Sequence, residues 1–160
     1  FRRSILTTTP GFSAISSSWS ARVSISTLAY TYSEGPPKIT KPRGNVVIWL
    51  CTMNCSYNLP LAEHHKNEDF VRDLRAWGKI ARHLYIWDYT TNFKHYLFIH
   101  PNLRVLGPNL RFFLENHVDG VFEQGATGTP GAEFAELRSW LLAKLLCARD
   151  SVLFVPDHDY

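Results

Sequence analysis

Residues 84–92 constrain the fold of this chain more than any other stretch. They read Leu-Tyr-Ile-Trp-Asp-Tyr-Thr-Thr-Asn, a β-branched and aromatic run that predicts a buried strand and then turns polar. One helical pattern precedes this run and another follows it. In a parallel α/β domain this arrangement places the polar residues at the carboxyl end of a strand, where such folds carry their functional groups.

Further apolar runs and helical patterns extend this arrangement along the chain. We expect three more strands, three helices and the order β, β, α, β, α, β, α. The expected strands are 23–30, 45–51, one that begins at Leu84, and 118–123. The expected helices are 67–82, one that begins at Gly107 and ends at Asn116 or Gly120, and 133–146. Residues 30–44 contain three prolines, so they predict a surface connection with no helix.

The chain divides into a central domain and two flanking segments. We expect residues 1–22 to be irregular, residues 23–147 to form the domain, and residues 148–160 to form a tail with a short strand at 152–155. Residues 1–20 show no signal peptide, and the chain begins at Phe1 rather than methionine. We therefore expect a fragment of a longer protein.

Each expected helix has an apolar face. Asn67 is expected to cap the first helix, with acidic residues in its first turn. The expected buried faces are Phe70, Leu74, Trp77, Ile80 and Ala81 in the first helix, Leu110, Phe113, Leu114 and His117 in the second, and Phe134, Leu137, Leu141, Leu142 and Leu145 in the third.

The composition excludes several classes of function. Hydrophobic residues make up 45% of the 160 residues and charged residues 19%, which is typical of a globular domain. The net charge of +3 comes without a lysine or arginine run, so nucleic acid is not an expected partner. No apolar run approaches the roughly 18 residues of a membrane span, so we expect no membrane contact.

No cofactor or metal site is expected from the motifs. The glycine-rich stretch 124–131 lacks the Gly-Lys-Ser/Thr ending of a phosphate-binding loop. His64 and His65 are adjacent and point apart, which does not favour a metal site. Cys51 and Cys55 are separated by three residues, not the two of zinc and redox motifs, and we expect buried thiols or a local disulfide.

Two fold classes are compatible with this order of elements. A complete (β/α)8 barrel needs roughly 250 residues, so the chain can supply about half of one. The alternative is a complete small doubly wound domain. Both are α/β folds with a parallel sheet.

Asp88 and Glu123 are the candidate catalytic residues. Each follows apolar strand residues directly, and in adjacent parallel strands both would emerge at one edge of the sheet. Two carboxylates that face one cleft can divide acid and base roles, because repulsion and burial separate their pKa values. The alternative is that each acid pairs with an arginine or caps a loop.

Aromatic and polar residues beside these acids are candidate sugar contacts. Trp87 and Tyr89 share one face of the predicted strand with Tyr85, and Asp88 lies on the other. Flat rings stack on the apolar faces of sugars, although Tyr85 and Trp49 fit a core role better. The loop that follows contributes Asn92 and His95, which lie where ligand contacts are common.

The ordered motifs resemble the DUF4838 family, whose members look like glycoside hydrolases and often carry an upstream domain similar to that of α-glucuronidases. The resemblance covers about residues 23–146. Its motifs, in order, are Ile25-Ser26-Thr27-Leu28-Ala29-Tyr30, Leu50-Cys51 with Cys55, Leu84-Tyr85-Ile86-Trp87-Asp88-Tyr89, Asn92-Phe93-Lys94-His95-Tyr96-Leu97, Phe122-Glu123-Gln124-Gly125 and Glu133-Phe134-Ala135-Glu136-Leu137-Arg138.

This resemblance implies a partial (β/α)8 TIM barrel, roughly the carboxyl-terminal half, that acts on an oligo- or polysaccharide. Asp88 and Glu123 would then lie at a rim facing the sugar, with Gln124 as a further contact. The chain departs from the family pattern at Asn54, where an acid is expected, at Leu59, where a histidine is expected, and at Cys147, where a tryptophan is expected.

Two functions follow as alternatives. The first is glycoside hydrolysis, incomplete without the first half of the barrel. The second is carbohydrate binding without catalysis, or a purely structural remnant of a barrel. In either case a half barrel leaves two strand edges unpaired, and we expect self-association through them.

Overall fold

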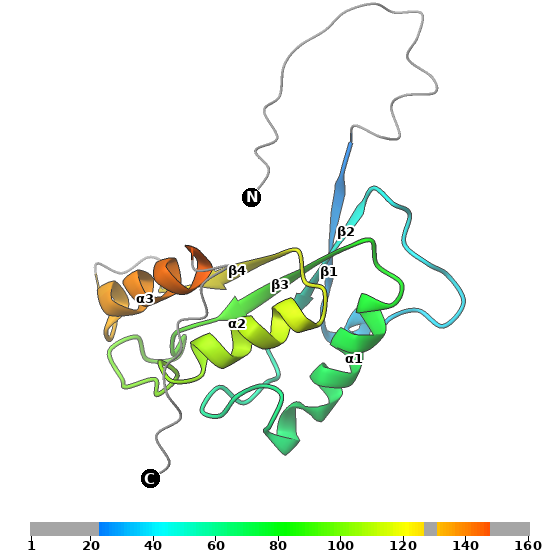
Figure 1. Cartoon of the computed structure of the whole chain (residues 1–160). Coiled ribbons are helices and arrows are strands. Elements are labelled where there is room, and N and C mark those ends of the chain that lie inside the picture. Colours follow the sequence, from blue (N-terminus) through cyan, green and yellow to red (C-terminus); the bar gives the residue numbers. More distant parts are fainter. Residues whose placement is uncertain (1–22, 127–130, 148–160) are drawn as a thin grey trace, which may run out of the picture.

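The computed structural model describes residues 23–126 and 131–147. The expected order of elements is confirmed in these residues (Figure 1). The strands and helices are β1 (Ile25–Ala29), β2 (Val46–Cys51), α1 (Glu68–Gly78), β3 (His83–Tyr89), α2 (Leu106–Glu115), β4 (Gly120–Gln124) and α3 (Ala135–Cys147). Two short 3-10 turns, η2 (Thr31–Ser33) and η3 (His65–Asn67), complete the set. The expectations for residues 1–22 and 152–155 lie outside the described residues.

The described strands form one parallel sheet in the order β1-β2-β3-β4. Each strand therefore pairs with the one that precedes it in the chain. The expected α/β class with a parallel sheet is confirmed. The register places Trp49 opposite Tyr85 between β2 and β3, and Trp87 opposite Phe122 between β3 and β4.

Helices α1 and α2 cover one face of the sheet (Figure 1). Residues alternate along β3, so Leu84 and Ile86 are buried on this face. They pack in one cluster with Leu74 of α1 and Phe113 of α2. Burial of a large apolar side chain contributes about 1.5–3 kcal/mol, so this cluster is the main source of the domain's stability.

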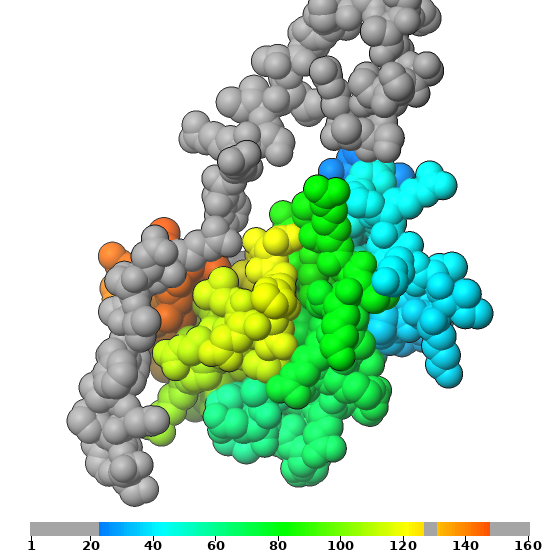
Figure 2. Space-filling view, turned by 45° about the vertical axis from the view of Figure 1, so that its right-hand side comes forward, coloured from blue at the N-terminus to red at the C-terminus, as the bar shows by residue number. Residues whose placement is uncertain are grey.

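The connection from β1 to β2 contains no α-helix, as the prolines predicted. Only η2 interrupts it, and Figure 2 shows the connection, in blue to cyan, projecting from the body of the molecule. The Trp77 indole N–H donates to the carbonyl of Glu34 at 2.7 Å and so ties the connection to α1.

The expected faces of all three helices need correction. Ile80 and Ala81 lie beyond the end of α1, although both pack against the core. In α2, Leu110 and Phe113 are buried as expected, but Leu114 is exposed and His117 lies beyond the helix end. Of the third expected face, Leu137 in α3 and Phe134, which precedes α3, are exposed. The buried residues of α3 are Arg138 and Leu142, while Leu141 and Leu145 pack against the core.

Asn67 does not cap α1 with its side chain, contrary to expectation. Its amide instead bonds the backbone of Ser56: the Ser56 N–H donates to Oδ1 at 2.7 Å, and Nδ2 donates to the Ser56 carbonyl at 3.1 Å. A buried amide gains two hydrogen bonds this way, whereas a cap would give it one.

The described cysteines are free thiols. Cys51 is buried, Cys55 is half-buried and Cys147 is exposed. Of the two alternatives for Cys51 and Cys55, the structure therefore shows thiols rather than a disulfide.

Candidate functional site

Asp88 and Glu123 are brought together near the carboxyl ends of β3 and β4. Their Cα atoms are paired in the register of the two strands, so both side chains leave the same face of the sheet. That face is the one covered by the helices. Side chains alternate along β3, so Asp88 points to the same side as the buried Leu84 and Ile86. The two acids are neighbours within the covered side of the domain.

Asp88 is 3% exposed and accepts two hydrogen bonds on one oxygen. The Thr52 hydroxyl donates to Oδ1 at 2.5 Å and the Tyr89 N–H donates to the same atom at 2.8 Å. Burial raises the pKa of Asp88 to about 6, and the two donors partly oppose that rise. The acid therefore changes charge near neutral pH.

Glu123 has a different environment. Its Oε2 atom is buried and finds no hydrogen-bond partner among the described residues. Burial, followed by repulsion from Asp88, raises the pKa of Glu123 well above its usual value. Neither acid forms an ion pair within the described residues. A protonated and an ionised carboxyl side by side are the components of acid and base catalysis.

Side chains from the loop after β2 surround Asp88. Tyr57 donates its hydroxyl to the Thr52 carbonyl, and the pKa of Tyr57 is raised by burial. Burial, followed by repulsion from Asp88, also raises the pKa of the Cys55 thiol. Both groups keep their protons at physiological pH, so they add no negative charge beside the acids.

The opposite face of the sheet carries a row of aromatic rings, here termed the aromatic face: Trp49, Tyr85, Trp87 and Phe122. The rings meet edge to face, with centroid separations of 4.8 Å for Trp49–Tyr85, 6.5 Å for Trp49–Trp87 and 4.9 Å for Trp87–Phe122. The described helices do not cover them. The first three are half-buried, so Trp49 and Tyr85 are not enclosed core residues.

The aromatic face is shaped by a glycine and hollowed by a groove. A Cβ at Gly120 would lie 3.0 Å from a ring carbon of Tyr85, so glycine allows this ring to lie against β4. The groove encloses about 400 Å³ and is lined by Ser26, Thr27, Leu28, Trp49, Trp87 and Phe122. The surface of this groove is mainly apolar, with the three aromatic rings on its floor and walls.

Gln124 and Tyr89 lie at the end of the aromatic face where β3 and β4 terminate. The Trp87 indole N–H donates to Oε1 of Gln124 at 2.7 Å, which fixes the plane of the indole. Tyr89 contacts the ring of Phe93 at 5.7 Å. Burial, followed by the neighbouring Cys51 and Tyr30, raises the pKa of Tyr89 to about 12, so its hydroxyl keeps its proton.

Asn92 and His95 belong to the loop after β3. Oδ1 of Asn92 accepts the N–H groups of Lys94 and His95 at 3.1 Å and 3.2 Å, which folds the loop back on itself. The His95 ring is exposed and stacks obliquely on Phe98 at 5.1 Å. The structure brings Trp87, Tyr89 and Gln124 together, and places the two acids on the other side of the sheet.

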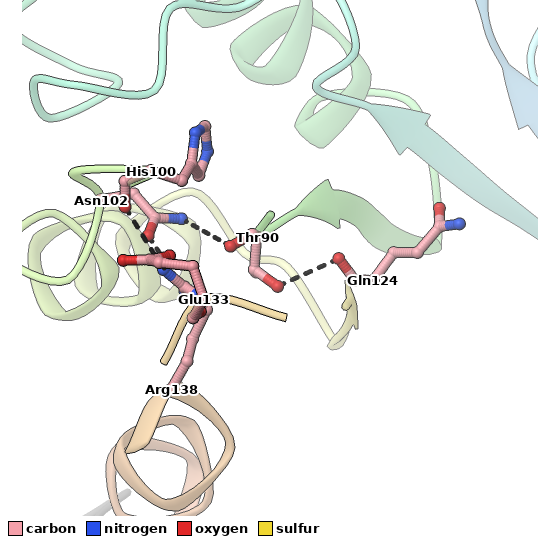
Figure 3. Close-up of polar contacts among 6 residues, drawn as sticks. All are labelled: Thr90, His100, Asn102, Gln124, Glu133 and Arg138. Atoms are coloured by element: carbon pink, nitrogen blue, oxygen red, sulfur yellow. Dashed lines mark hydrogen bonds and ion pairs between the residues drawn. The ribbon is translucent and has the colours of Figure 1, made fainter. Parts of the chain in front are cut away.

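A second polar cluster links the loops that follow β3 and β4 (Figure 3). We term it the Arg138 cluster, and it consists of Thr90, Asn102, Glu133 and Arg138. Arg138 is 3% exposed, and its Nη2 pairs with the carboxylate of Glu133 at 2.8 Å. Its Nε donates to Asn102, and Asn102 in turn donates to the carbonyl of Thr90. The Thr90 hydroxyl then donates to the backbone carbonyl of Gln124, so the cluster joins α3 to the ends of β3 and β4.

Sequence reasoning missed Thr52 and the Arg138 cluster. Thr52 follows an apolar strand just as Asp88 does, and parallel pairing of the two strands was the signal that joins them. Arg138 is a charged residue at helical spacing from Leu142 and Leu145, and a charge on an apolar face signals a buried partner.

The described residues show neither a metal-ligand cluster nor a membrane-spanning helix. They contain no group of three or more histidine, cysteine or acidic side chains placed to hold a metal ion. They also contain no helix with the length and hydrophobicity needed to cross a bilayer.

Comparison with curated proteins and with solved structures gives no match. The model of the family DUF4838, described as a domain of unknown function, matches residues 17–155. This range contains every strand and helix described above. The chain therefore belongs to the DUF4838 family.

Proposed function

We propose that this domain binds an oligo- or polysaccharide on its aromatic face, as the carboxyl-terminal half of a glycoside-hydrolase-like barrel. One observation carries the proposal: the rings of Trp49, Trp87 and Phe122 line a groove that no described helix covers. Aromatic rings present large apolar area at small conformational cost, and the Gln124 amide beside Trp87 supplies polar atoms for hydroxyl groups.

The topology supports the barrel part of this proposal. A sheet in which each strand pairs with its predecessor is the arrangement of a (β/α)8 barrel. A doubly wound sheet reverses its strand order at a switch point, and no reversal occurs among the described strands. In a barrel with helices outside, the aromatic face would point inward.

Hydrolysis by Asp88 and Glu123 is the second candidate. The observation that favours it is their pairing in register with raised pKa values, near the carboxyl end of the sheet. Their position on the helix-covered side counts against it, because a sugar on the aromatic face lies across the sheet from both carboxyl groups. Binding is therefore the function that the geometry supports best.

The test is glycan binding and hydrolysis by the full chain, with neutral and uronic-acid-containing oligosaccharides. Trp87→Ala should weaken binding at least about tenfold, equal to about 1.4 kcal/mol. Trp140→Ala is the matched control, because Trp140 is an exposed indole on α3, away from the aromatic face. Equal binding by both variants and the wild type would contradict the proposal.

Two further variants separate binding from catalysis. If the acids only support the fold, Asp88→Asn and Glu123→Gln should retain binding as long as they fold. If hydrolysis occurs and is lost in both variants, the second candidate replaces the first.

A further inference from the structure

We propose that Thr52 is a positioning residue that makes Asp88 the ionised member and Glu123 the protonated member of the Asp88–Glu123 pair. Asp88 is then the carboxylate and Glu123 the acid, and a use of this difference in catalysis rests on the second candidate function above.

The hydroxyl of Thr52 is held in a fixed direction by its own backbone. Its N–H donates to the Trp87 carbonyl at 3.1 Å, which extends the pairing of β2 with β3 by one residue. Its carbonyl accepts the Tyr57 hydroxyl. Because both backbone groups of Thr52 are hydrogen-bonded, its backbone is held in place beside Asp88.

The bond from Thr52 favours the ionised form of Asp88. The Thr52 hydroxyl lies 2.5 Å from Oδ1 of Asp88 and donates to it. The Tyr89 N–H adds a second donor on the same oxygen. Donors aimed at a carboxyl group stabilise its charged form.

Glu123 receives no such support from the part of the chain that the structure describes. Its buried Oε2 has no partner among the described residues, and its neighbour in register is the charge of Asp88. Burial without donors and repulsion from a like charge both favour the protonated form. Both acids are buried, but only Asp88 has hydrogen-bond donors among the described residues. This difference decides which of the two is ionised.

The other titratable groups near Asp88 do not alter this balance. Cys55 and Tyr57 come from the loop after β2, and Tyr89 follows Asp88 in β3. Burial raises the pKa of each of these three groups, so each is neutral when the acids titrate. No lysine, arginine or histidine of the described residues forms an ion pair with either acid.

The test is a titration of the two side-chain carboxyl carbons by NMR, on the full chain and without sugar. In the wild type, Asp88 should ionise at a lower pH than Glu123. Thr52→Val should raise the Asp88 midpoint by about one unit, a tenfold change in proton affinity, because only the donor is lost. Thr52→Ser, which keeps the hydroxyl, should restore the wild-type midpoint.

A second variant tests the proposal even if Thr52→Val does not fold. Glu123→Gln should leave the Asp88 midpoint nearly unchanged, because Glu123 is already neutral when Asp88 ionises. A fall of about one unit would mean that Glu123 carries the charge, and would overturn the proposal. So would a wild-type titration in which Glu123 ionises first, or a folded Thr52→Val with an unchanged midpoint.

The titration tests the role of Thr52 and the glycan measurements test the proposed function, so either proposal can be contradicted without the other. Loss of glycan binding with the expected titration would remove only the proposed function. Normal glycan binding with the reverse order of ionisation would remove only the role of Thr52.

Discussion

A carboxyl group that holds its proton near neutral pH makes stability depend on pH in a defined direction. The pKa of Asp88 rises from 3.8 to about 6 on folding, and the pKa of Glu123 also rises. Folding therefore favours the protonated forms. The contribution of Asp88 is complete below about pH 4 and is lost as the pH rises through 6, and that of Glu123 is lost at higher pH.

We predict that the domain is more stable at pH 5 than at pH 7.5. Between these two pH values, Asp88 alone should change the free energy of unfolding by on the order of 1–1.5 kcal/mol, about half of its full contribution. Urea unfolding at pH 5 and pH 7.5 measures the total change. Asp88→Asn should make the pH dependence less steep, Asp88→Asn combined with Glu123→Gln should nearly abolish it, and a wild-type free energy that increases with pH would contradict the assignment.

At the scale of residues, the sequence predicted which acids lie together but not their environment. Asp88 and Glu123 both follow apolar strand residues, and parallel pairing alone brings them side by side. The alternation of side chains also placed Trp87 and Asp88 on opposite faces. Thr52 was missed because a hydroxyl carries no distinctive pattern until the register of β2 and β3 is known.

Among the helices, α3 depends on one buried ion pair. The side chains of Arg138 and Glu133 are 4% and 8% exposed. We predict that Arg138→Met costs about 3–5 kcal/mol, because it leaves the Glu133 carboxylate buried without its partner. Chemical denaturation measures the loss.

Two controls accompany this prediction. Arg138→Met combined with Glu133→Gln should be less destabilised than Arg138→Met alone, since no charge is left unpaired. Arg72→Met should leave the denaturation midpoint unchanged, because its ion pair with Asp69 lies in solvent. Equal destabilisation by the Arg138 and Arg72 variants would contradict the burial argument.

At the scale of elements, prediction succeeded where one apolar face was distinct. Phe70, Leu74 and Trp77 gave the buried face of α1 because polar residues occupy the rest of that helix. In α3 apolar residues occur all round the helix, including the exposed Trp140 and Leu146. Its buried face was fixed instead by Arg138, whose partners lie in loops that periodicity does not describe.

The whole molecule presents two features that favour association. Among the described strands, β1 and β4 each have one neighbour, and the aromatic face is uncovered. We predict that the chain self-associates and that Phe122→Lys reduces this, because Phe122 belongs to the aromatic face. Sedimentation velocity measures the distribution of species.

Leu137→Lys is the matched control for this experiment. Leu137 is 47% exposed and Phe122 is 43% exposed, but Leu137 belongs to α3. A monomeric wild type, or equal effects of the two variants, would contradict association through the aromatic face.

The parallel topology could be predicted from the order of apolar runs and helical patterns. Closure of the sheet into a barrel could not be predicted, because half a barrel and an open parallel sheet have the same order of strands and helices. The Asn67 side chain shows the same limit on a smaller scale. Its position before α1 predicted a cap, but Ser56, which is distant in sequence from the helix, offered two bonds.

The sequential pairing of the strands has a consequence for how the sheet can form. β2 pairs with β1, β3 with β2 and β4 with β3, so each of these strands can pair with a strand that has already been synthesised. The sheet can grow in the direction of synthesis, one strand at a time, as the chain leaves the ribosome. Translation and assembly thus run in the same order.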